Sequence, residues 1–406
     1  MVHALTRNKT STLAGIGLGL SLGLAGNVVH AEANPYYLGG SLGVTRVSNV
    51  YRTASDENSD TVTTASLLAG VDQRIGRQHL TINGTLQQSH YATNSLLNNN
   101  GYSLRSNLDW ATVGNLSGTL SASATRQLAN YNAAGAGVQP VFAKNIENDR
   151  QYQALARLGL VTRWSIEASY THSSQEFSLI EYSALNFSQD AGSLGLVYRP
   201  SDLLRLGLAF RRTEGEYPQY PLTFDGVRPF YVDDTFKRND IDFSGDWKLT
   251  GSSHVTTRLS WTSSQHDPAE TMNYRGLTGS LGWDYDPGGR WTFSSKLTRD
   301  TGEQASSDLG PSQNRVGNSI QLNTSYALTA KIALTGSASE RRGTYRNSDA
   351  SDGFQNDHSI SVGTQFAYSR SLSLSCQAYR TGRSSGISYN NFNATGVGCT
   401  AQALVY

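Results

Sequence analysis

The residue types that most often carry chemistry are sparse in this chain. Its only two cysteines are Cys376 and Cys399, and no cluster of histidine or carboxylate accompanies them. The segments around them alternate apolar and polar residues, and both cysteines are in phase with the apolar positions. The hairpin centre implied by pairing them falls near residue 387. We therefore predict a cross-strand disulfide between Cys376 and Cys399, rather than a redox or metal site, in a compartment that permits oxidation.

Candidate catalytic groups are scattered as well. The eight histidines follow no motif spacing, and His172-Ser173 lies in a different predicted hairpin from Asp233-Asp234. The chain contains no Walker loop, no metal-binding helix and no dinucleotide-binding glycine motif. We predict that the protein is not an enzyme and uses no cofactor or metal.

One set of charged residues recurs on the polar side of alternating segments. If those segments are strands around a lumen, the set lines it, together with Ser, Thr, Asn and Gln. Because both signs are present, such a lining suits a neutral or mixed, heavily hydroxylated solute better than a purely anionic one. The alternative is that these charges pair with each other and stiffen the wall. The set comprises Arg105, Asp109, Glu167, Arg211, Asp242, Asp246, Arg258, Asp284, Lys296 and Arg341.

Aromatic residues gather between Glu214 and Thr235, which we expect to be the longest loop. Aromatic faces can stack on sugar rings, and the three prolines of the stretch would hold a loop in a fixed shape. One interpretation is a constriction or sugar-contacting loop at a channel mouth, and the other is an outer loop packed on itself. The aromatic members are Tyr217, Tyr220, Phe224, Phe230 and Tyr231.

The elements that position these residues are predicted strands with a period of two. In the stretch 80–87, Leu80, Ile82 and Leu86 lie on one face, whereas Thr, Asn and Gln lie on the other. The same alternation holds at 164–170, 241–249 and 291–297. One apolar and one polar face are typical of a strand between lipid and an aqueous lumen.

Connections of two lengths alternate along the chain. Eight short turns and nine longer loops predict a transmembrane antiparallel up-and-down β-barrel of about 18 strands (range 16–20), with both termini on the short-turn side. The short turns are expected at 74–78, 113–115, 161–164, 200–203, 249–253, 286–290, 328–331 and 369–371. The longer loops are expected at 53–60, 94–100, 131–147, 178–182, 214–235, 266–272, 302–314, 346–357 and 384–391.

Aromatic residues flank both kinds of connection, which predicts two girdles at the two membrane interfaces. A soluble β-sandwich would explain neither the girdles nor the turn asymmetry nor the aromatic C-terminus, Tyr406. Beside the short turns lie Trp110, Trp164, Tyr198, Trp247, Trp283, Trp291, Tyr326 and Tyr368. Beside the long loops lie Tyr51, Tyr91, Tyr131, Tyr182, Tyr274, Tyr345 and Tyr389.

Residues 1–31 are predicted to be a cleaved secretory signal peptide. Arg7 and Lys9 precede an apolar stretch at 13–26, and small residues favour cleavage after Ala31, which leaves 32–406 as the barrel. An uncleaved anchor helix is the alternative. Cleavage would remove two of the 33 basic residues and none of the 32 acidic ones, so the mature chain is close to neutral. Nothing in this balance favours nucleic acid as a partner.

Residues 42–132 resemble the exopolysaccharide-biosynthesis outer-membrane barrels, the EpsL-like group of the "β-barrel porin 2" set. The resemblance rests on the stretches Val44–Arg52, Asn58–Thr61, Ile75–Gln78, Asn94–Leu97, Gly101-Tyr102, Leu116–Leu120 and Arg126–Ala129. It implies a role in carrying a newly made polysaccharide across the outer membrane, beside a periplasmic polysaccharide-export partner. The resemblance supplies no catalytic residues.

Three functions stay open at this point. The first is a pore in the outer membrane of a Gram-negative bacterium that takes part in exopolysaccharide export, with membrane lipid and polysaccharide as its partners. The second is a general or sugar-selective diffusion porin, which would conduct small ions steadily and have no link to polymer output. The third is a surface adhesin or assembly scaffold that acts through its outer loops.

Overall fold

The computed structural model describes residues 34–129, 131, 141–159, 163–224, 229–301, 316–346, 352–386 and 391–406. The predicted signal peptide lies outside these residues. Within them, no helix is long and apolar enough to cross a membrane. The three short 3-10 helices are η1 (Ser95–Leu97), η2 (Ile180–Leu185) and η3 (Glu270–Met272).

Eighteen strands make up almost all of the described chain, in agreement with the predicted number. They are β1 (Tyr36–Val47), β2 (Asp60–Ile75), β3 (Gln78–Tyr91), β4 (Asn99–Ala111), β5 (Leu116–Leu128), β6 (Ile146–Gly159), β7 (Trp164–Phe177), β8 (Phe187–Ser201), β9 (Leu204–Phe224), β10 (Pro229–Thr250), β11 (Ser253–Asp267), β12 (Tyr274–Tyr285), β13 (Trp291–Asp300), β14 (Val316–Ala327), β15 (Ile332–Arg346), β16 (Asp352–Ala367), β17 (Leu372–Ser385) and β18 (Phe392–Val405).

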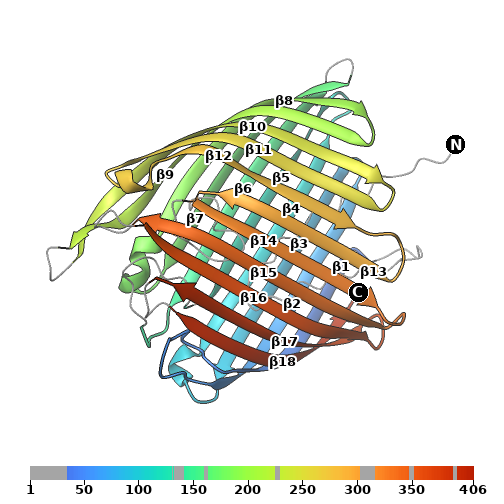
Figure 1. The fold of residues 1–406 in the computed structure, drawn as a ribbon. Coiled ribbons are helices and arrows are strands. Elements are labelled where there is room, and N and C mark those ends of the chain that lie inside the picture. The colour runs from blue at the N-terminus through green and yellow to red at the C-terminus, as the bar shows by residue number, and fades with distance from the viewer. Residues whose placement is uncertain are drawn as a thin grey trace.

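Each strand pairs antiparallel with its neighbours in sequence, and the sheet closes on itself because β1 pairs with β18 as well as with β2. The result is a closed up-and-down barrel of tilted strands (Figure 1). Closure gives every strand two hydrogen-bonding neighbours and so removes the free edges that a membrane does not tolerate.

The outer surface of this barrel is apolar. Leu67, Leu86, Leu194 and Val362 are each more than 60% exposed, and they alternate with residues that face the interior. A folded protein in water would not leave so many large apolar side chains exposed, whereas a strand in lipid must. The protein is therefore a β-barrel of the Gram-negative outer membrane, as its sequence predicts.

Short and long connections segregate to opposite ends of the barrel, and β1 begins and β18 ends at the short-turn end. Two tight turns place a glycine at positive φ, Gly76 at 61° and Gly288 at 72°, where a side chain would be strained. By the general rule for these barrels, the short-turn end faces the periplasm and the long-loop end faces the outside.

The prediction that residues 214–235 form a loop is wrong. Strands β9 and β10 continue through it and pair with each other as far as Phe224 opposite Pro229. Its prolines are tolerated because β9 pairs with β8 only as far as Glu216, so Pro218 and Pro221 lie on a strand with a single neighbour. Two register shifts in the hairpin absorb the remaining mismatch. The predicted loop 346–357 is likewise shorter, because β16 begins at Asp352.

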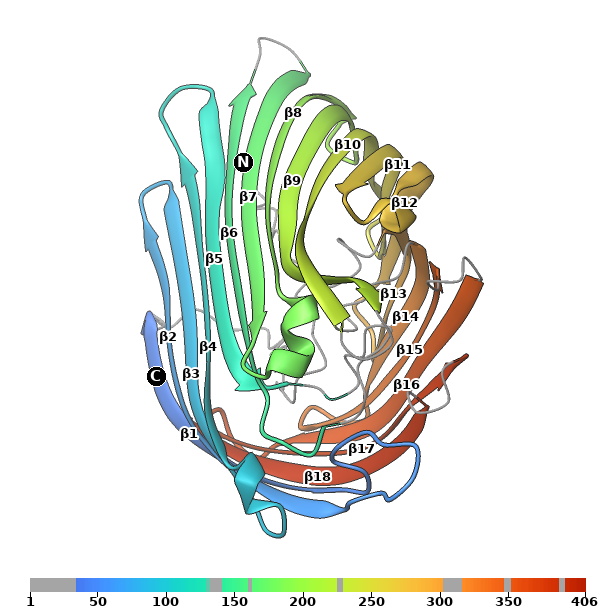
Figure 2. The ribbon, with the colours of Figure 1, turned by 90° about the vertical axis from the view of Figure 1, so that its left-hand side faces the viewer.

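This β9–β10 hairpin projects beyond the rim of the other strands in Figure 1. In the view from the long-loop end, the hairpin and η2 lie across the outline of the barrel opening (Figure 2). The long-loop end is therefore partly covered by ordered structure.

The predicted disulfide is present between Cys376 on β17 and Cys399 on β18. The two residues are direct register partners, and Cys399 also lies opposite Val44 of β1. The bond thus lies on the lipid-facing side, beside the pair of strands that closes the barrel.

Candidate functional site: the inner wall and the long-loop mouth

All ten predicted lining residues occupy the inward phase of their strands. Most of them directly precede or follow an exposed apolar residue, as Arg211 follows Phe210 and Lys296 precedes Leu297. Because successive side chains of a strand point to opposite faces, the polar neighbour faces the barrel interior. The strand register carries this alternation around the whole barrel.

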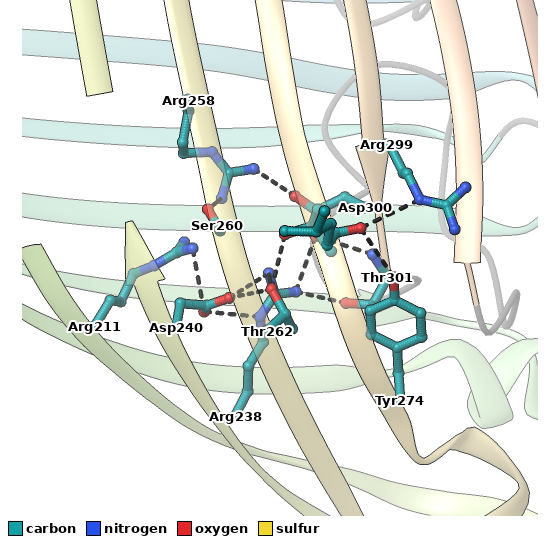
Figure 3. A network of polar contacts seen from close by, with 12 residues as sticks. Arg211, Arg238, Asp240, Arg258, Ser260, Thr262, Tyr274, Arg299, Asp300 and Thr301 are labelled. Atoms are coloured by element: carbon teal, nitrogen blue, oxygen red, sulfur yellow. Dashed lines mark hydrogen bonds and ion pairs between the residues drawn. The ribbon is translucent and has the colours of Figure 1, made fainter. Parts of the chain in front are cut away.

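Six charged side chains on the inner wall form one continuous network over β9, β10, β11 and β13. Figure 3 labels all of them except Asp242. At its centre the fully buried Arg238 donates to Asp240 through Nε at 2.8 Å and to Asp300 through Nη1 at 2.9 Å. Thr262 donates to Asp240 and is within 3.4 Å of the Arg238 guanidinium. These hydrogen bonds compensate for the desolvation of the central charges.

Two further arginines extend this network towards the lumen. Arg211 lies 3.1 Å from Asp240 and 3.0 Å from Asp242, and Arg258 donates to Asp300 at 2.6 Å. Ser260 donates to Asp242 and links the two halves. With three arginines and three aspartates the network is neutral in formal charge, and we refer to it below as the β9–β13 network.

The sequence prediction missed three central members of this network: Arg238, Asp240 and Asp300. Arg238 and Asp240 share the phase of the predicted Asp242 on the same strand. The alternation that places Asp242 inside the barrel continues upstream through Asp240 to Arg238, so the sequence does carry a signal for these two residues.

A second buried cluster lies on β15, β16 and β17. Asp357 accepts from Arg341 at 3.1 Å, from Arg383 at 2.6 Å and from Gln355 at 2.9 Å. The Arg383 guanidinium also lies 5.8 Å from the centre of the Phe392 ring, and that of Arg52 lies 5.6 Å from it. A single carboxylate thus holds two arginines, and an aromatic ring contacts one of them together with a loop arginine.

The remaining predicted lining residues are mostly paired too. Glu167 is held between Arg157 at 3.2 Å and Arg205 at 2.5 Å. Asp246 contacts His254 at 3.0 Å, and His254 lies 3.9 Å from Asp284. The interpretation that these charges pair and stiffen the wall therefore describes most of the set.

Arg105 and Asp109 are the more open members of the set. Both are exposed. Asp109 accepts from Thr119 at 2.9 Å and from Asn107 at 3.2 Å. Within the described part of the chain, Arg105 has no carboxylate at ion-pair distance. Lys296 lies on the inward face of β13, opposite Gln321.

A hydrophobic cluster occupies the long-loop end of the barrel over β1–β8. It comprises Tyr51, Val62, Tyr91, Leu97, Ala129, Tyr131, Phe177, Tyr182 and Leu185, and we call it the mouth cluster. Tyr182 of η2 is 2% exposed and Tyr51 is 6% exposed. The prediction that these tyrosines form a lipid-facing girdle is wrong, because the loops fold back and supply partners for their rings.

The mouth cluster is fixed by directed contacts as well as by packing. The Tyr131 hydroxyl donates to the Ala143 carbonyl at 2.6 Å, and the Tyr131 ring packs edge-on against Tyr51 at 5.4 Å. Burial raises the pKa of Tyr182 to about 12. Tyr345 and Tyr389 were predicted in the same girdle, but their side chains lie outside the described residues.

A second, smaller cluster lies at the base of the β9–β10 hairpin. Tyr217 is 7% exposed and packs between Phe187 and Phe236, and Phe236 stacks on the buried His266 at 5.2 Å. His266 in turn contacts Asp234 at 2.7 Å.

The five predicted sugar-contacting aromatics therefore have different environments. Tyr217 is enclosed by protein, Tyr220 is half-buried against the same cluster, and Tyr231 is 42% exposed. The side chains of Phe224 and Phe230 lie outside the described residues. The structure thus leaves Tyr231 as the most open described member of the set.

Several residues of the exopolysaccharide-family resemblance build the long-loop end. The fully buried Asn49 donates to the carbonyls of Thr53 and Asn393 and accepts from the Thr53 amide. The Asp60 carboxylate accepts from the amides of Thr93 and Asn94. These side chains tie the β1–β2 connection to β18 and to the β3–β4 connection.

Among the described residues, no group of three or more His, Cys, Asp or Glu side chains is placed to hold a metal ion.

No protein family model matches the chain, and no curated protein sequence matches it. Solved structures with a similar fold include Pseudomonas aeruginosa OpdK with vanillate, at 10% identity over 91% of this chain and 99% of that chain, with a TM-score of 0.48. P. aeruginosa OccK2 (OpdF) gives 11% identity over 92% and 98%, with a TM-score of 0.48. A BenF-like porin from Pseudomonas fluorescens Pf-5 gives 11% over 91% and 99%, with a TM-score of 0.46.

Proposed function

We propose that the protein is a diffusion pore for small polar solutes, either general or selective for sugars. The observation that carries the proposal is a closed 18-stranded barrel whose inward residues are polar and mostly paired in charge. A barrel of this strand number is too wide for its own side chains to fill, so it encloses an aqueous lumen.

The charge balance of the wall bears on the class of solute. In the β9–β13 network each arginine contacts at least one aspartate, so the network presents no net charge to a passing ion. Hydroxyl and amide groups lie between the paired charges. Such a wall offers many weak hydrogen bonds, which suits a hydroxylated solute that must enter and also leave.

The long-loop end would set the size limit. The mouth cluster fixes loops on one side, and the β9–β10 hairpin and η2 lie across the opening in Figure 2. Ordered structure of this kind restricts passage by size and shape, because buried side chains do not yield easily to a passing solute.

The proposal is tested by reconstituting the folded protein into liposomes and measuring swelling in isotonic sugars of increasing size. We expect fast swelling with monosaccharides, slower swelling with disaccharides and little with larger oligosaccharides. Empty liposomes and liposomes with heat-denatured protein are the controls. Swelling rates equal to those of the controls for every solute would contradict the proposal.

Exopolysaccharide export is the second candidate, and the resemblance in residues 42–132 favours it. Its motif residues Asn49 and Asp60 build the ordered long-loop end, where an emerging polymer would pass. The test is to delete the gene and to compare secreted with periplasmic polysaccharide. A fall in secreted polymer, with periplasmic accumulation or stalled synthesis, supports export. Unchanged polymer together with reduced uptake of small solutes leaves only the diffusion pore.

A further inference from the structure

A row of polar residues crosses the outer surface of the barrel near its long-loop end. Arg299 of β13 is the register partner of Asn318 of β14, which is the partner of Arg342 of β15. All three are exposed, and all three share the phase of the lipid-facing residues on their strands. We call these three residues the outer row.

The outer row lies directly at the edge of the apolar band. The next outward positions towards the short turns on β13 and β14 are Leu297 and Ile320, which are partners of each other and are 46% and 37% exposed. A ligand at the outer row would therefore contact cationic groups on its long-loop side and an apolar surface on its short-turn side. This arrangement matches an amphipathic lipid, which has a polar head group and apolar chains.

The two arginines are held so that both can reach one ligand. Arg299 donates through Nε to the Leu277 carbonyl at 3.2 Å and through Nη1 to the Asn318 side chain at 3.1 Å. A guanidinium has five N–H donors, so these two bonds leave further donors for an anion. Arg299 and Arg342 flank a single strand, which places their backbones about 10 Å apart.

Within the part of the chain that the structure describes, one acidic group on this surface would repel an anion. Glu340 lies two residues from Arg342 on the same face and contacts it at 2.8 Å. The exposed Arg275 adds a third positive charge, since it lies on the outward face of β12 two residues from Leu277. Among the described residues of this surface, three arginines against one glutamate leave a net positive charge.

We propose that the outer row binds a phosphate group of the phosphorylated glycolipid that forms the outer leaflet of this membrane. Arg299 and Arg342 would hold the phosphate, Asn318 would donate to it, and the acyl chains would lie on Leu297 and Ile320. Arginine suits this role because its planar fork pairs with phosphate oxygens. The long loops face the outside, so the outer row lies at the level of that leaflet.

A surface on β8, β9 and β10, five strands away along the sheet from β14, offers a matched comparison. There the outward-facing cations Arg212 and Lys237 flank Glu214: Arg212 contacts it at 2.6 Å, and Lys237 is its cross-strand partner. Glu216 and Asp190 lie nearby on the same face. This surface is not positive, so it should not retain a phosphorylated lipid.

The test measures lipid A binding to the full-length folded barrel in detergent by native mass spectrometry, with dephosphorylated lipid A and inorganic phosphate as comparison probes. We expect the double variant Arg299→Gln/Arg342→Gln to bind lipid A at least about tenfold more weakly. The matched variant Arg212→Gln/Lys237→Gln should bind as the wild type does. Glu340→Gln, which removes the opposing charge, should bind more tightly.

Three outcomes would overturn the proposal: equal binding by the wild type and the Arg299→Gln/Arg342→Gln variant, equal binding of dephosphorylated lipid A, or no gain with Glu340→Gln. Retention of inorganic phosphate without lipid A would also overturn it, because it would indicate a free-anion site. If the double variant fails to fold, as judged by heat-modifiable migration on a gel, Glu340→Gln and the single variant Arg342→Gln decide the question.

Discussion

The two ends of the barrel use the same residue types in opposite ways. At the short-turn end, Trp291 is 55% exposed and pairs with Tyr326 at 4.6 Å, and Trp164 is 40% exposed and pairs with Tyr198 at 4.5 Å. At the long-loop end, Tyr182 and its neighbours are almost fully buried. In these two sets, the aromatic rings are exposed beside the short turns and buried where the long connections pack over them.

Because their aromatic residues pack differently, the two ends of the barrel should have different roles. The short-turn end anchors the barrel in the membrane through exposed rings at the interface. The long-loop end has its own core and buried charges, and so resembles a small globular layer set on a membrane cylinder. Changes at the long-loop end should therefore cost more stability than changes at the short-turn end, and only the former should alter passage through the pore.

The largest expected effect comes from the β9–β13 network. Arg238→Ala leaves Asp240 and Asp300 buried without their central cation, which should lower the free energy of unfolding by about 4 kcal/mol. Urea unfolding of the barrel in detergent micelles measures it. Arg77→Ala is the control at the short-turn end, because Arg77 is exposed and donates to a backbone carbonyl, that of Thr112, and it should change little. Equal losses would contradict the contrast between the ends.

The next effect concerns the mouth cluster. Tyr182→Ala removes a ring that is 2% exposed and should cost about 3 kcal/mol, because it leaves a cavity among packed side chains. Loosening η2 should also increase the swelling rate with disaccharides. Tyr182→Phe keeps the ring and should retain wild-type permeability. Wild-type swelling by Tyr182→Ala would show that this cluster does not limit passage.

The disulfide allows the short-turn end of the barrel to be tested separately from the long-loop end. Cys376 lies close to the start of β17 at the short-turn end, and the loop that the bond closes spans a sequence separation of 23 residues. Cys376→Ser/Cys399→Ser should cost about 2 kcal/mol, mainly through the unfolded chain, and should leave permeability unchanged. Gel migration of the heat-denatured wild type, with and without reductant, reports the bond. Identical migration in both conditions would argue against it.

The smallest effect is expected at the exposed girdle. Trp291→Ala removes a ring that is half in lipid and should cost about 1 kcal/mol. It should slow membrane insertion in a folding time course more than it alters conductance. A loss as large as that of Tyr182→Ala would mean that the two ends are equivalent after all.

The sequence allowed the barrel, its strand number, the disulfide and the inward phase of the charges to be predicted, because all of these follow from a period of two that local residues set. The hairpin at 214–235 could not be predicted, because its prolines break a strand only where both neighbours are present. The burial of Tyr51 and Tyr182 depends on loops returning to cover them, which is tertiary information.

The candidate site was predictable in its residue types more than in its arrangement. The phase of Arg211 and Asp242 placed them inside, yet which arginine meets which aspartate depends on strand tilt and register. Asp300 joins Arg238 across two intervening strands, and no spacing in the sequence encodes that contact.

A diffusion pore requires that the barrel have an open lumen with a charge-balanced wall. Single-channel recording in a planar lipid bilayer, with a salt gradient to measure the reversal potential, tests it most directly. We predict stepwise conductance with only weak preference between cation and anion. The absence of conductance steps from folded protein would contradict the proposed pore. A reversal potential close to that of a perfectly ion-selective pore would contradict the charge-balanced wall.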